Sequence, residues 1–164
     1  MIEASTPRVS SRETSQASGK RGALPAIAIG GAIAGVLDLT QALIHFGVGI
    51  PFSIAAGLLG PDAARHGGAG TYALGVLLHF FIALCFAAAY YLASRRLRFL
   101  VDYPLVCGML YGILVELVMV LAVLPLSALH AAGPYALQQL LQGIGVHMVT
   151  VGLPIAYSVR RFGR

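Results

Sequence analysis

The chain contains four apolar stretches, each long enough to cross a lipid bilayer as a helix. They are Leu24–Phe46, Thr71–Ser94, Pro104–Leu124 and Tyr135–Val159. About 20 apolar residues, at about 1.5 Å of rise each, cross roughly 30 Å of hydrocarbon. Only 10% of the residues are charged, whereas a soluble domain has about a quarter. The sequence therefore predicts an all-α fold, with four antiparallel transmembrane helices forming one membrane domain at residues 23–160.

The basic residues are concentrated in alternate connections. Of the 11 Lys and Arg residues, all but Arg65 lie before the first stretch, between the second and third, or after the fourth. Because basic residues favour cytoplasmic segments, we expect both termini in the cytoplasm. This placement also accounts for the net charge of +5. We therefore expect the lipid bilayer as the partner of this chain, and no nucleic acid.

The segments outside the four stretches differ in character. Residues 1–22 are rich in Ser, Thr and charge, so we expect a disordered cytoplasmic tail. The two outer connections are apolar and alike. One runs from Pro51-Phe52-Ser53 to Gly60-Pro61, and the other from Pro125-Leu126-Ser127 to Gly133-Pro134. We expect a short interfacial helix in each, with ordinary turn chemistry as the alternative.

The two halves of the membrane domain, residues 23–94 and 103–160, share a pattern. Gly75-x-x-x-His79 corresponds to Gly143-x-x-x-His147. Gly31-x-x-x-Gly35 is followed by Asp38, and Gly108-x-x-x-Gly112 is followed by Glu116, although the two acids are one residue out of step. One interpretation is a parallel repeat of a two-helix unit, with its axis along the membrane normal.

Each apolar stretch carries one ionisable residue near its middle. An ionisable group at the bilayer centre costs a few kcal/mol or more, so it normally faces the bundle interior and has a partner. One such residue per stretch predicts a shared intramembrane polar cluster, with two further polar residues of the first stretch close to it. Its members are Asp38, His79, Glu116, His147, Gln41 and His45.

Small residues spaced four apart lie on the same helix face as these polar groups. Small side chains at i and i+4 let membrane helices approach closely, so each such face should turn toward the bundle. The glycines that we expect to pack against other helices are Gly31, Gly35, Gly75, Gly108, Gly112 and Gly143.

Three functional interpretations stay open. The polar cluster could support small-solute or proton-linked transport or sensing. It could serve only helix assembly in a structural or accessory subunit. Least favoured is a redox protein in which the cluster binds haem or a transition metal. No HExxH, CxxC, Walker, Rossmann or GxSxG motif occurs in a usable context. We therefore expect no enzyme and no cofactor, while a metal, a second copy of the chain or a membrane partner protein stays open.

Several glycine-rich segments resemble those of a group of small bacterial four-helix membrane proteins and, more loosely, YagU-type inner membrane proteins. These segments are Gly31–Gly35 followed by Asp38, Ala56–Gly60, Gly75–Phe80, Gly108–Gly112 and Pro125-Leu126-Ser127. The resemblance covers most of residues 27–159. It implies a location in the bacterial inner membrane and no particular activity.

Overall fold

Helices form all the regular secondary structure of the part of the chain that the structure describes. The structure is a computed structural model that describes residues 11–131 and 133–163, with side chains from residue 22 onward. Four helices are long and apolar enough to cross a membrane: Gly22–Phe46, Ala69–Ser94, Pro104–Leu126 and Leu137–Phe162. The prediction of an all-α four-helix bundle is confirmed, and the protein is a multi-pass membrane protein.

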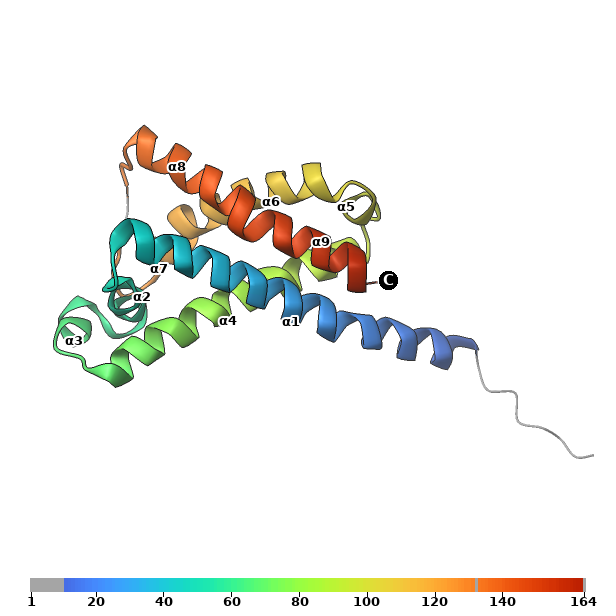
Figure 1. The fold of residues 1–164 in the computed structure, drawn as a ribbon, viewed down its shortest axis with the longest axis horizontal. Coiled ribbons are helices and arrows are strands. Elements are labelled where there is room, and N and C mark those ends of the chain that lie inside the picture. The colour runs from blue at the N-terminus through green and yellow to red at the C-terminus, as the bar shows by residue number, and fades with distance from the viewer. Residues whose placement is uncertain (1–10, 132, 164) are drawn as a thin grey trace, which may run out of the picture.

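The first two spans are uninterrupted helices, α1 (Ser11–Phe46) and α4 (Ala69–Ser94). We had expected the membrane domain to begin at residue 23. The helix α1 instead begins at Ser11. Residues 1–10 of the expected disordered tail lie outside the described residues. α1 packs against α4 along one side and against the fourth span along another (Figure 1).

The third and fourth spans each contain a π-helical segment. The third consists of α6 (Pro104–Val118), η1 (Met119–Val123) and α7 (Leu124–Leu126). The fourth consists of α8 (Leu137–His147), η2 (Met148–Gly152) and α9 (Leu153–Phe162). In each, a proline follows the π segment at the second position of the next helix. A proline has no N–H to offer the carbonyl four residues earlier, which favours a local departure from α-helical bonding.

The first outer connection holds two short helices, α2 (Ile50–Leu59) and α3 (Pro61–Arg65). α2 packs against α4 instead of lying free at the surface: Ala55 is fully buried, and the carbonyl of Pro51 lies directly against Gly75. A short helix α5 (Phe99–Asp102) follows the second span. α2 therefore helps to close one end of the bundle.

The prediction of a second interfacial helix was wrong. The described residues of that connection form turns and extended chain. The Ser127 hydroxyl donates a hydrogen bond to the Leu124 carbonyl at 2.8 Å and accepts one from the Leu129 N–H at 3.3 Å. The Ala128 N–H donates to the Gly57 carbonyl at 2.8 Å. These bonds turn the chain sharply after α7 and fix it to α2, so no new helix begins there.

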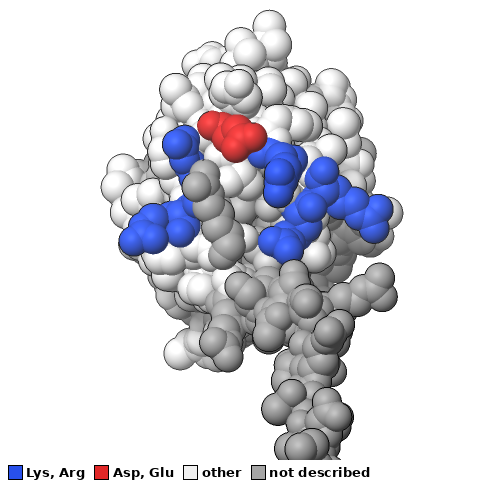
Figure 2. All heavy atoms as spheres, turned by 90° about the vertical axis from the view of Figure 1, so that its right-hand side faces the viewer, with Lys and Arg blue, Asp and Glu red and all other residues white. Residues whose placement is uncertain are grey.

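The two ends of the bundle differ in charge. One, here called the arginine end, carries Arg95, Arg96 and Arg98 beside α5 and Arg160 and Arg161 in the last turn of α9, all of them exposed. Figure 2 shows basic side chains spread around this end. The other, here called the α2 end, carries α2, α3 and Arg65 (Figure 1).

The buried core lies toward the arginine end. Its largest fully buried side chains include Tyr90, Ile155 and Val159. The Tyr111 hydroxyl donates to the Phe86 carbonyl at 2.7 Å, and the rings of Tyr90 and Tyr111 meet edge to face at 4.9 Å. Aromatic side chains therefore join α4 to α6 across the bundle. Polar groups lie farther from the arginine end, in the middle of the bundle.

Candidate functional site

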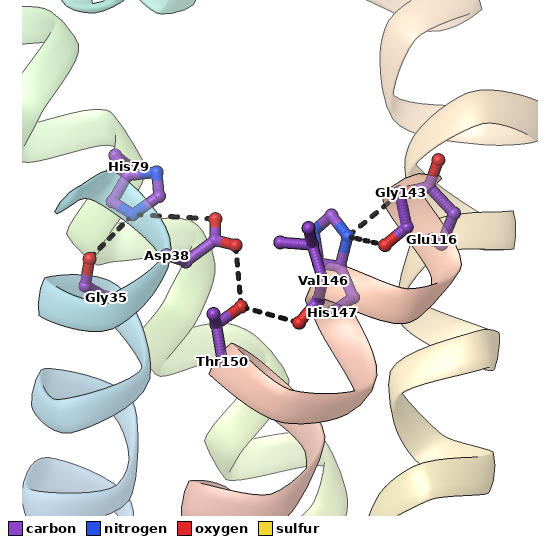
Figure 3. A network of polar contacts seen from close by, with 8 residues as sticks. All are labelled: Gly35, Asp38, His79, Glu116, Gly143, Val146, His147 and Thr150. Carbon is purple, nitrogen blue, oxygen red and sulfur yellow. Dashed lines mark hydrogen bonds and ion pairs between the residues drawn. The ribbon is translucent and has the colours of Figure 1, made fainter. Parts of the chain in front are cut away.

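Asp38 of α1 and His79 of α4 form the first acid–histidine pair (Figure 3). The His79 Nε2 atom lies 4.0 Å from Asp38 Oδ2 and 3.0 Å from the Gly35 carbonyl oxygen. Both neighbours are oxygen acceptors, so Nε2 carries a hydrogen and donates it to Gly35. The two side chains are only 15% and 16% exposed. Glycine at position 35 brings α1 close to α4, and this approach places the two groups together.

Thr150 of η2 joins this pair and was missed by the sequence analysis. Its hydroxyl oxygen lies 2.9 Å from Asp38 Oδ1 and 2.9 Å from the Val146 carbonyl oxygen (Figure 3). A hydroxyl has one hydrogen and two lone pairs. If Asp38 is ionised, the hydroxyl donates to it. If Asp38 is protonated, Asp38 donates to the hydroxyl, which then donates to Val146. Both protonation states of Asp38 therefore keep a hydrogen bond.

Glu116 of α6 and His147, the last residue of α8, form the second pair. The His147 Nδ1 atom lies 2.9 Å from Glu116 Oε2 and 3.0 Å from the Gly143 carbonyl oxygen. Nδ1 therefore carries a hydrogen, and a second proton, on Nε2, would give an imidazolium whose Nδ1–H already faces a carboxyl group. A Cβ at position 143 would collide with the Glu116 carboxyl group, so only glycine leaves room for this pair.

The two pairs meet at one cavity of about 80 Å³. Asp38, His79 and His147 supply its polar groups, while Glu116 lies behind His147. The remaining lining is apolar: Ile54, Ile82, Ala83, Phe86, Val115, Met119 and Val151. Sites for organic ligands usually measure about 300–1,000 Å³. This cavity is therefore of a size for a few water molecules or a small charged group.

Two residues assigned to the cluster from sequence do not join it. His45 is exposed at the end of α1, and its Nε2 atom lies 2.9 Å from the side-chain nitrogen of Gln142. It is about 10 Å farther along the helix than Asp38, at 1.5 Å per residue, which takes it beyond the cavity. Gln41 is half-buried and makes no hydrogen bond to the four ionisable side chains among the described residues.

The six glycines expected at helix contacts all lie close to another helix. Gly31 and Gly35 lie against Leu84 and Phe80 of α4. Gly75 lies against α2, and Gly143 against Glu116. Gly108 and Gly112 lie against the backbone of η2, where the Gly152 oxygen is 3.0 Å and the Met148 nitrogen 2.5 Å from the positions that a Cβ would take. The sequence analysis did not select Gly152, whose partner is the Gly108 carbonyl.

The site offers acid–base groups in pairs. Among the described residues, no three His, Cys, Asp or Glu side chains lie close enough together to bind a metal ion jointly. Each pair contains one carboxyl and one imidazole, and each acid is paired with the histidine of its own half of the chain. No family model, curated protein or solved structure matches the chain. Carboxyl and imidazole groups paired in this way are able to bind and release protons.

Proposed function

We propose that the protein belongs to the bacterial inner membrane and that its two acid–histidine pairs bind and release protons to drive or sense the movement of a small solute. We propose no enzymatic reaction. One observation carries the proposal: Asp38, His79 and His147 line a single cavity inside a membrane bundle. Ionisable groups in that position are costly, and they commonly mark ion pathways or proton relays.

The hydrogen bonds around the cavity support proton exchange. Asp38 keeps a partner in Thr150 whether or not it is protonated. His147 has Glu116 beside it, which would stabilise the imidazolium form. A few water molecules in the cavity would suffice to connect the two pairs, because each water can donate and accept.

Infrared difference spectroscopy during a pH titration of the reconstituted protein tests this function. A carboxyl group that exchanges its proton in a water-poor site gives a C=O stretching band that follows pH. We expect the part of this band that comes from Asp38 to disappear in Asp38→Asn, leaving the part from Glu116, and both parts to remain in Asp62→Asn, which changes an exposed acid of α3. A spectrum of Asp38→Asn identical to that of the natural sequence would show that Asp38 exchanges no proton, and the proposal would fall.

The orientation is part of the proposal: the arginine end faces the cytoplasm, together with both termini. It is supported by the basic residues beside α5 and at the end of α9. The resemblance to small bacterial inner membrane proteins points to the same membrane. Reporter fusions at Gly22, Asp62, Arg98, Ala131 and Arg164 should alternate between cytoplasm and periplasm. A periplasmic reporter at Arg164 would contradict this orientation.

A purely structural role for the cluster is the second candidate. It is favoured by the bonds that His79, His147 and Thr150 make to backbone carbonyls of their own or a neighbouring helix. In that case the protein is an accessory subunit, and the cluster serves only to hold the bundle together. Asp38→Asn would then lower the stability of the bundle, and no carboxyl band would follow pH in the natural protein.

A further inference from the structure

An apolar groove of about 340 Å³ adjoins the polar cavity near the α2 end. It lies between α2, α4 and the third span, and its lining includes Leu58, Leu78, Val123 and Leu124. The groove and the cavity share three lining residues, Ile54, Ile82 and Met119. These three side chains therefore form the partition between an apolar space and a polar one.

The partition consists of side chains and not of backbone hydrogen bonds. Met119 is unbranched, and methionine adapts readily to irregular or changing packing. It is also the first residue of the π-helical segment η1, and such segments concentrate at functional sites. Rotation of the Met119 side chain would open the partition without breaking a helix.

The charges around the cavity favour a cation. Asp38 lines it and Glu116 lies one hydrogen bond behind His147, whereas no Lys or Arg is among its lining residues. The Lys and Arg side chains that the structure describes lie at the two ends of the bundle. While His79 and His147 are neutral, a positively charged group in the cavity would thus meet the Asp38 carboxylate with no Lys or Arg side chain beside it.

We propose that the solute is an amphiphilic monocation, whose ammonium group binds beside Asp38 and whose apolar tail occupies the groove. The inference rests on the proposed function because it assigns a ligand to the same cavity. The cavity volume suits a small head group, and the groove volume falls in the usual range for organic ligands. Head and tail would lie on opposite sides of the Ile54–Ile82–Met119 partition.

Methionine-methyl NMR in lipid nanodiscs tests the proposal with octylammonium as the probe. The chain has 4 methionines, so their labelled methyl signals can be assigned by substitution. Met119 reports on the partition, while the exposed Met109 of α6 reports on general partitioning into the lipid around the bundle. We expect a saturable shift of the Met119 signal, and only a weak, non-saturating response at Met109. Octanol and nonanoate carry the same octyl tail and should give no saturable shift at Met119.

Three variants complete the test. Asp38→Asn should weaken octylammonium binding by at least tenfold. Val123→Phe, which fills the groove away from the cavity, should also weaken it. Leu121→Phe is the matched control, because Leu121 lies in the same π segment but is 71% exposed and lines neither space.

Parallel shifts at Met119 and Met109 for all three probes, or unchanged binding in Asp38→Asn, would overturn the proposed ligand. Binding at fixed pH needs no proton transfer, so its failure leaves the infrared test of the proposed function standing. Conversely, saturable octylammonium binding without a pH-dependent carboxyl band would retain the ligand site and reject the proton chemistry.

Discussion

Toward the arginine end, Tyr90, Ile155 and Val159 are at most 1% exposed, while toward the α2 end the bundle interior is occupied by Asp38, His79 and His147 around a cavity. Lipid is as apolar as a leucine side chain, so helices in a membrane are held together by close packing and hydrogen bonds and not by the hydrophobic effect. The arginine-end half uses close packing. The α2-end half replaces part of it with polar pairs, which is what a site for protons or a solute requires.

The largest expected effect tests the close packing itself. Gly112→Ala should destabilise the folded protein by about 3 kcal/mol or more, because overpacking costs ~1–3 kcal/mol even where side chains can move aside. Here the new methyl group would meet the backbone of Met148, which cannot rotate away. Thermal unfolding in detergent, followed by size-exclusion chromatography, measures the loss.

Gly145→Ala is the matched control for Gly112→Ala. Apart from its two chain neighbours and the backbone of its own helix turn, no described atom lies within 4 Å of the position that its Cβ would take. Alanine also favours a helix over glycine by about 1 kcal/mol, so Gly145→Ala should be neutral or slightly stabilising. Equal loss in the two variants would contradict the role given to backbone contact between the third and fourth spans.

The next effect tests the Glu116–His147 pair. Glu116→Leu should cost about 2 kcal/mol, since His147 loses its carboxyl partner and keeps only the Gly143 carbonyl, and a hydrogen bond to a charged group contributes ~1.5–3 kcal/mol. Glu116→Gln keeps an oxygen acceptor and should cost less. Urea or heat unfolding of the two variants under one set of conditions gives the comparison. If Glu116→Leu is as stable as the natural protein, the pair is not a structural support of the α2-end half.

Thr150→Val should have a smaller effect, about 1 kcal/mol, because it removes the hydroxyl between Asp38 and the Val146 carbonyl and keeps the side-chain shape. Its main consequence should appear in the infrared titration, where the Asp38 carboxyl band should change position after losing its partner. An unchanged band would show that Thr150 does not contact Asp38 in the membrane.

The smallest expected effect lies in the arginine-end half. Tyr111→Phe removes the bond to the Phe86 carbonyl, which as a helix carbonyl also accepts a backbone bond. The loss should be near the average of about 0.6 kcal/mol for hydrogen bonds between membrane helices. A loss larger than that of Thr150→Val would reverse the comparison, because hydrogen bonds would then hold the arginine-end half more strongly than the cavity region.

Hydropathy alone predicted the spans, because about 20 consecutive apolar residues have few other structures open to them. The spacing of small residues predicted which helix faces turn inward, and from it we expected Asp38, His79, Glu116 and His147 to share one site. Three of them line the cavity, and Glu116 lies behind His147. The depth of each residue in the membrane was predicted less well than its helix face. His45 shares a helix with Asp38 but lies beyond the cavity. Helix faces repeat along the sequence, whereas the depth of the cavity depends on how α2 closes the end of the bundle.

Thr150 could not be found by helical spacing, because its direction depends on the π-helical segment η2. A signal for that segment does exist in the sequence. Met119-Val120 and Met148-Val149 are each followed, after three residues, by Leu-Pro. These two runs coincide with η1 and η2 and with the prolines that follow them. A threonine in an apolar helix is not by itself a sign of a polar site, since its hydroxyl usually bonds to its own helix.

The backbone contact between the third and fourth spans would also act as a pivot for any tilt of one span against the other. Gly108 and Gly112 meet Gly152 and Met148 so closely that the two helices cannot slide there. At about 1.5 Å per residue, roughly 6 Å of helix lies between Gly108 and Pro104, but roughly 21 Å lies between Gly112 and Leu126. A small rotation about this contact would therefore be magnified several-fold at the α2 end. The arginine end would move least, while the mouth of the groove would widen or narrow.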